Sequence, residues 1–270
     1  MKNALTSFSR NGCLNMAAAT AFYALLSTIP IIFVIVSAAG FFFEGSKEII
    51  LAVIKATDTL FPSLVEVIQR EVLAVISKKG LIGGTGIIIM LWSSTLVFSS
   101  LEFSFSRIFD IEKRRSFLKS KLVSTGFLIL GGVVLAASIL LTTAAKIAQS
   151  KFLAPYDIKA IHFFSTSIFL PYILPVLLLT LLFAVIYTVL SRRQVSPKEG
   201  LAGGLICATM FESAKHLFAW YIANLGRHSV IYGSLGAMVV VILWFFYASV
   251  IILFCGELIA AWKRENQIRT

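Results

Sequence analysis

The chain has 270 residues, of which 58% are hydrophobic and 14% are charged, with a formal net charge of +11. A soluble domain carries roughly 25% charged residues, so this composition excludes an ordinary soluble globular protein. The mean hydropathy of +0.91 indicates instead a chain that is largely embedded in a membrane.

Long uncharged runs predict the membrane-spanning elements. A helix needs about 20 apolar residues to cross a hydrocarbon core of about 30 Å, and most of the uncharged runs are at least that long. The sequence therefore predicts an all-α fold with one membrane domain over residues 1–270. Six spanning helices are predicted, near 17–43, 81–106, 122–145, 161–190, 200–223 and 231–262.

The segment between the first two spans predicts two amphipathic helices over 46–78, on the outer side. Leu64, Ile68, Val72 and Ile76 recur there at helical spacing. Two interpretations remain open on sequence. The helices lie on the outer membrane face or cap the bundle, or they form a mobile lid over an outward cavity.

Prolines inside two spans predict kinks, because each removes a backbone donor and clashes with the preceding turn. They are Pro30 in the first span and Pro171 and Pro175 in the fourth. Interrupted helices at matching positions of inverted halves are typical of transporters. The alternative is that neighbouring helices simply accommodate these prolines, as in many membrane proteins.

Glycines are predicted to let helices approach closely or to act as hinges. Gly200, Gly203 and Gly204 begin the fifth span, and Gly233 and Gly236 begin the sixth.

Charges within the spans are the candidate functional residues. Glu212 falls about 18 Å along the helix that begins near Gly200, close to the bilayer centre. Lys215 follows on the same face, so the spacing predicts an ion pair. Glu257 and Glu102 approach the inner border, where Glu102 is predicted either to extend its carboxylate to the membrane surface or to form an ion pair. Charged residues within a membrane mark ion or substrate pathways, or they fix helix packing, and both interpretations of these residues remain open.

Basic residues in the loops predict the orientation. With the N-terminus inside, the inner segments hold 14 Lys and Arg residues and the outer segments hold 9. Cytoplasmic loops carry the excess of basic residues, so both termini are predicted to be cytoplasmic. The basic residues are scattered at membrane borders, which favours anionic lipid headgroups over nucleic acid as partners. The predicted headgroup cluster is Lys113, Arg114 and Arg115.

The sequence offers no catalytic constellation. Its three histidines lack paired metal-ligand spacing, its three cysteines imply no disulfide framework, and no phosphate-binding Gly-Lys-Ser/Thr loop occurs. We therefore expect no metal, no cofactor and no enzymatic activity.

Five motifs carry a resemblance to a known family. They are Ala19-x-Ala21-Phe22-Tyr23-Ala24-Leu25-Leu26-Ser27-x-x-Pro30, Leu91-Trp92-Ser93-Ser94, Phe211-Glu212-x-x-Lys215, Ile231-Tyr232-Gly233-Ser234-Leu235-Gly236-Ala237 and Gly256-Glu257-Leu258. In this order they resemble the YihY/BrkB membrane proteins. The resemblance implies a six-span bacterial inner-membrane protein and supplies no substrate. The ribonuclease BN label once given to such proteins conflicts with the missing metal-ligand set.

Two functions of different class follow. The first is a transporter or permeation protein for a small solute, ion or lipid-linked molecule. The second is a non-transporting envelope scaffold or assembly factor, in which the charges only lock helices together. The predicted pathway residues are Tyr23, Ser27, Pro30, Glu212, Lys215 and Glu257.

Overall fold

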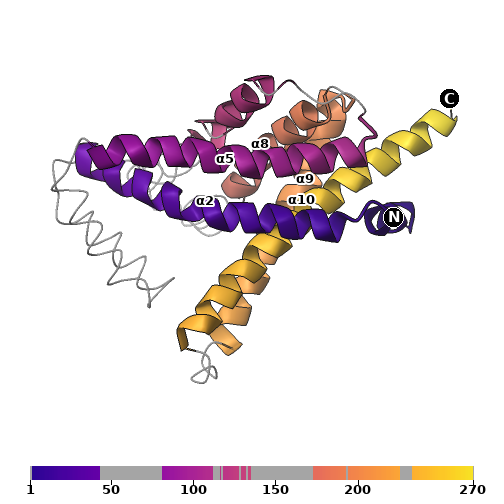
Figure 1. Cartoon of the computed structure of the whole chain (residues 1–270). Helices are drawn as coiled ribbons and strands as arrows, with labels where there is room; N and C mark the ends of the chain where they lie inside the picture. The colour runs from indigo at the N-terminus through magenta and orange to yellow at the C-terminus, as the bar shows by residue number, and fades with distance from the viewer. Residues whose placement is uncertain are drawn as a thin grey trace, which may run out of the picture. The chain divides into compact units, whose positions relative to one another are not determined.

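The computed structural model describes residues 2–42, 81–111, 116, 118–127, 129–131, 133–134, 173–192, 194–225 and 233–269. Within these ranges the regular elements are helices and none is a strand, which confirms the predicted all-α class for this part of the chain. Further helical residues lie between 118 and 134. The named helices are α1 (Lys2–Arg10), α2 (Cys13–Phe42), α5 (Leu81–Ile108), α8 (Leu174–Leu190), α9 (Pro197–Leu225) and α10 (Gly233–Arg269) (Figure 1).

Each of the six predicted spans overlaps helical residues, although the membrane crossing of all six stays a prediction. The predicted outer helices 46–78, the basic cluster 113–115 and Pro171 lie outside the described residues.

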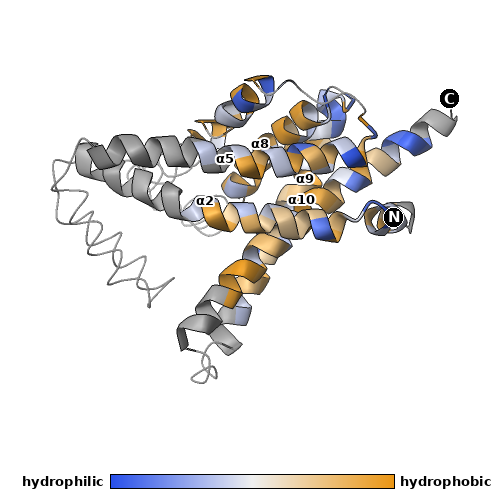
Figure 2. Cartoon of the chain, viewed as in Figure 1, coloured by the Kyte–Doolittle hydropathy of each residue, from blue (hydrophilic) through white to orange (hydrophobic). Residues whose placement is uncertain are grey.

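One described helical stretch is long and apolar enough to cross a hydrocarbon core. It is Val239–Glu265 of α10, with 27 residues and a mean hydropathy of 2.6. Figure 2 shows the apolar middle of α10 and the hydrophilic residues near its C-terminal end. Shorter apolar stretches are Cys13–Thr28 and Leu174–Leu190. Length and composition therefore identify one candidate span among the described residues.

The exposed side of α8 is apolar, which is the reverse of a helix on the surface of a soluble protein. Leu177, Leu181 and Val185 follow one another at intervals of four residues and are all exposed. The buried residues of the helix are Thr180, Phe183, Tyr187 and Leu190. An exposed apolar stripe of this kind suits contact with lipid.

Residue contacts divide the chain into two compact units. The first comprises Met1–Cys13, Glu102–Lys215 and Ile251–Thr270, and the second comprises Leu14–Leu101 and His216–Val250. That these units form one membrane domain stays a prediction.

Aromatic side chains form the core of the first unit. The Tyr187 ring lies 5.6 Å from Phe105 and 6.5 Å from Phe183, and Phe183 lies 5.8 Å from Phe211. These rings join α5, α8 and α9. Tyr187 is fully buried, and its hydroxyl donates to the backbone oxygen of Ile252 at 3.0 Å. A buried tyrosine usually needs such a partner, so this bond also ties α8 to α10.

Small residues bring α8 and α9 into backbone contact, as the sequence predicts for the glycines of the fifth span. A Cβ added at Gly204 would lie 2.7 Å from the backbone oxygen of Thr180 and 2.8 Å from the backbone nitrogen of Ala184. A Cβ added at Gly203 would instead meet the side chain of Ile259 on α10. The close approach therefore depends on the absence of a Cβ atom at these positions.

The start of α9 is fixed by a capping box. The backbone N–H of Glu199 donates to Ser196 Oγ at 3.3 Å, and the backbone N–H of Ser196 donates to Glu199 Oε2 at 2.8 Å. Pro197 occupies the first helical position, where its missing N–H costs no intrahelical bond.

The remaining predicted hinge residues lie at or inside helices. α2 is helical through Pro30, and Pro175 occupies the first turn of α8. Gly233 is the first residue of α10, and Gly236 lies in its first turn. Their predicted roles as kinks or hinges stay predictions.

The second unit is joined by polar and aromatic contacts between neighbouring helices. Thr20 of α2 and Ser100 of α5 share a hydrogen bond of 2.8 Å. Phe218 of α9 lies 5.0 Å from Trp244 of α10, measured between ring centroids.

Candidate functional site

Three carboxylates of the first unit are shielded from solvent. The Glu257 residue is 0% exposed, and the side chains of Glu212 and Glu102 are 8% and 13% exposed. A buried charge is costly unless it is paired or hydrogen-bonded, so the partners of each carboxylate decide what it can do.

Glu257 projects from α10 into a small polar cluster. Asn11 Nδ2 donates to Glu257 Oε1 at 2.5 Å, and Cys13 Sγ donates to the same oxygen at 3.6 Å. Among the described residues, none donates a hydrogen bond to Oε2, although this oxygen is buried. One oxygen of the carboxyl group is therefore held, and the other can carry a proton.

The turn between α1 and α2 supplies Asn11, and the first residue of α2 supplies Cys13. Gly12 has φ +67, a left-handed conformation that glycine adopts readily after a helix. The rings of Phe8 and Phe254 pack edge to face at 5.9 Å, which docks α1 against α10. Asn11 and Cys13 are thereby placed beside Glu257. Sequence reasoning missed both residues, because nothing local links them to position 257.

Glu212 and Lys215 form a close ion pair along one face of α9, as their spacing predicts. Glu212 is buried, whereas the Lys215 side chain is 46% exposed. The pair therefore joins a buried anion to a cation that reaches the helix surface.

Glu102 joins three segments of the first unit. Arg192 Nη2 donates to Glu102 Oε1 at 3.3 Å, and Ser120 Oγ donates to Oε2 at 2.6 Å. Of the two alternatives predicted for Glu102, the structure shows the ion pair, with Arg192 as the partner. The sequence indicated this pairing, because Glu102 and Arg192 both lie near the predicted inner border of the membrane.

Tyr23 and Ser27 belong to the second unit. Tyr23 is half-buried, Ser27 is buried, and the Ser27 hydroxyl donates to the backbone oxygen of Tyr23 at 2.8 Å. This bond lies within one helix. A pathway shared with Glu212 and Glu257 stays a prediction.

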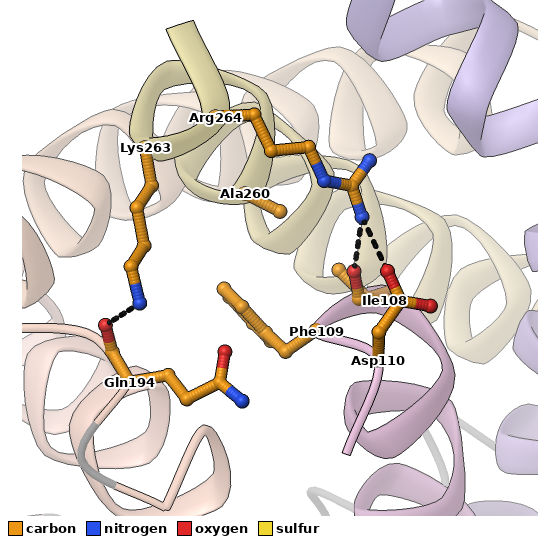
Figure 3. Close-up of a pocket in the computed structure, with 7 residues that line it drawn as sticks. All are labelled: Ile108, Phe109, Asp110, Gln194, Ala260, Lys263 and Arg264. Carbon is orange, nitrogen blue, oxygen red and sulfur yellow. Dashed lines mark hydrogen bonds and ion pairs between the residues drawn. The ribbon is translucent and has the colours of Figure 1, made fainter. Parts of the chain in front are cut away.

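No group of three or more His, Cys, Asp or Glu residues is arranged to hold a metal ion in the part of the chain that the structure describes. A cavity of about 170 Å³ does occur in the first unit, where α5 and α10 approach the turn between α8 and α9 (Figure 3). It contains none of the six predicted pathway residues.

Known proteins resemble this chain over nearly its whole length. Residues 4–270 match the family described as virulence factor BrkB. A UPF0761 membrane protein of Alkalilimnicola ehrlichii is 25% identical over 93% of this chain and 55% of its own length. One from Legionella pneumophila is 25% identical over 97% of this chain and 61% of its own. YfkH of Bacillus subtilis, named as ribonuclease-like, is 23% identical over 93% of this chain and 90% of its own.

The chain spans a little over half the length of the first of these relatives. No solved structure matches it. The UPF0761 names describe membrane proteins and no catalysed reaction, and the ribonuclease-like name belongs to YfkH. The predicted resemblance is thereby confirmed, and the chain belongs to the BrkB family of integral membrane proteins.

Proposed function

We propose that this protein is a multi-pass protein of the bacterial inner membrane that moves a small solute, ion or lipid-linked molecule across it. Six predicted spans and the excess of basic residues in the predicted inner loops support this topology, with both termini in the cytoplasm. The cluster Lys113, Arg114 and Arg115 would then meet anionic headgroups, and no nucleic acid is involved.

The observation that carries this proposal is the carboxyl group of Glu257. It is fully buried in an apolar helix, and one of its oxygens receives no hydrogen bond from the described residues. An acid in this setting destabilises the fold unless it is compensated, so its presence points to a function. Proton and ion pathways use such carboxyl groups, because gaining or losing a cation changes their charge within the membrane.

The second candidate is the envelope scaffold, and a different observation favours it. Glu212 pairs with Lys215 on α9, and Glu102 pairs with Arg192 across two segments. The Glu102 pair fixes the packing of α5 against the end of α8, and the Glu212 pair neutralises a buried charge within α9. A scaffold needs nothing more from them.

Solute and proton flux in proteoliposomes tests the proposal with Glu257→Gln. Glutamine keeps the shape and can still accept a hydrogen bond from Asn11, but it cannot bind and release a proton. We expect the flux to fall at least about tenfold, since carboxyl groups of this kind contribute about 10²–10⁴-fold where proton transfer limits a step. Glu265→Gln is the matched control, because it makes the same change at an exposed position of α10.

Circular dichroism and elution volume must match the parent protein before fluxes are compared. Parent-like flux in Glu257→Gln, with the parent active, would remove Glu257 from the pathway. No flux of any solute class by the parent protein, with Glu212→Gln and Glu257→Gln both complementing a deletion strain, would establish the scaffold instead.

A further inference from the structure

The cavity of the first unit is lined by two cations beside an apolar floor. Lys263 and Arg264 extend from α10 on either side of it, and the Phe109 ring lies between them (Figure 3). Gln194, from the turn between α8 and α9, and Asp110, after α5, complete its polar rim. The cavity of about 170 Å³ is large enough for a phosphate-sized group.

Backbone carbonyl groups hold the two cations in place. Lys263 Nζ donates to the backbone oxygen of Gln194, and Arg264 Nη2 donates to the backbone oxygen of Ile108 at 3.0 Å. Arg264 also pairs with Asp110 Oδ2 at 3.2 Å. An ammonium group has three N–H donors and a guanidinium group has five, so these contacts use only part of the donor capacity. The cations are thus positioned with donors to spare.

The position along α10 indicates the level of the membrane. Lys263 and Arg264 lie in the last turn of the apolar stretch Val239–Glu265. Basic residues at the end of a span reach the headgroup layer, where phosphate groups of lipids lie. The predicted orientation makes this the cytoplasmic leaflet, which carries a negative surface potential from its anionic lipids.

We propose that this cavity binds the phosphate group of an anionic phospholipid, with Lys263, Arg264 and the Gln194 amide as its donors. Phe109 and Ile108 form the apolar floor of the cavity. Inorganic phosphate shares the same chemistry, so both ligands are tested. Asp110 opposes binding, because its carboxylate competes for Arg264 and repels the anion. The lipid assignment rests on the proposed membrane topology, but it does not depend on transport.

Two isosteric variants should change the affinity in opposite directions. Gln194→Glu places a carboxylate on the rim and leaves the backbone oxygen that Lys263 contacts. We expect it to weaken binding about tenfold or more, since like charges in contact cost more than the 1.4 kcal/mol of one tenfold step. Asp110→Asn removes the competing charge and should strengthen binding about three- to tenfold. Asparagine suits this position, where φ is 51.

The measurement is the thermal unfolding midpoint of the whole chain in detergent, titrated with phosphatidylglycerol, phosphatidylcholine or inorganic phosphate. Lys198→Gln is the matched control, because it changes the net charge by the same amount as Gln194→Glu at an exposed residue outside the cavity. A response to phosphatidylglycerol alone identifies lipid as the source of the phosphate. An equal response to inorganic phosphate identifies the free anion.

Either response supports the site only if the two variants move the affinity in opposite directions and Lys198→Gln leaves it unchanged. The proposal is overturned if the parent responds to neither ligand, if the zwitterionic lipid binds equally well, or if Lys198→Gln weakens binding as much as Gln194→Glu. Because both cavity variants keep the backbone contacts of Lys263 and Arg264, loss of folding does not obscure the result.

Discussion

Arg192→Met is expected to lower the free energy of unfolding by about 2 to 4 kcal/mol, because it takes the cation away from a buried carboxylate. Removing one partner of a fully buried ion pair costs about 3–5 kcal/mol. The side chains of Arg192 and Glu102 are 18% and 13% exposed, so we expect a somewhat smaller loss. Methionine keeps most of the length of the arginine side chain, which limits the loss of packing. Detergent unfolding monitored by circular dichroism measures the change.

A double-mutant cycle isolates the ion pair from the packing. Glu102→Gln with Arg192→Met should be more stable than the sum of the single losses indicates, because it leaves no uncompensated charge. Lys119→Met removes an exposed cation from the helical residues near Ser120 and serves as the control. A coupling energy below about 0.5 kcal/mol would show that the pair contributes no more than an exposed salt bridge.

The helices could be predicted because long uncharged runs require helical backbone pairing in a membrane. Their ends could not. α9 begins at Pro197 rather than 200, since the capping box of Ser196 and Glu199 starts it, and α10 continues to Arg269 rather than 262. Charged residues end an apolar run, but they do not end a helix. Hydropathy therefore locates the span, and capping chemistry locates the terminus.

The same contrast holds for the candidate site. Glu212 and Lys215 are three positions apart, so helix geometry alone predicts their pairing. Asn11 and Glu257 are 246 positions apart, and Arg192 and Glu102 are 90 apart. No local period links such residues. Only the packing of α1 on α10, and of the α8 end on α5, brings them together.

Gly204→Ala should destabilise the first unit by about 1 to 3 kcal/mol, although alanine is the better helix former. Overpacking a tight contact costs about that much. The added methyl group would meet backbone atoms of Thr180 and Ala184 at 2.7 and 2.8 Å. Backbone atoms cannot rotate away, so α8 and α9 must separate. That separation would also disturb the ring contact between Phe183 and Phe211, which joins the same two helices.

Gly126→Ala is the matched control, because a methyl group there would meet nothing within 4 Å. In a helix this change gains up to about 1 kcal/mol of intrinsic propensity, so the control should be neutral or slightly stabilising. The two substitutions are chemically identical, and opposite signs in the same unfolding measurement assign the cost to the helix contact. Equal effects would mean that α8 and α9 can separate at little cost, and the close approach at Gly204 would then contribute nothing to stability.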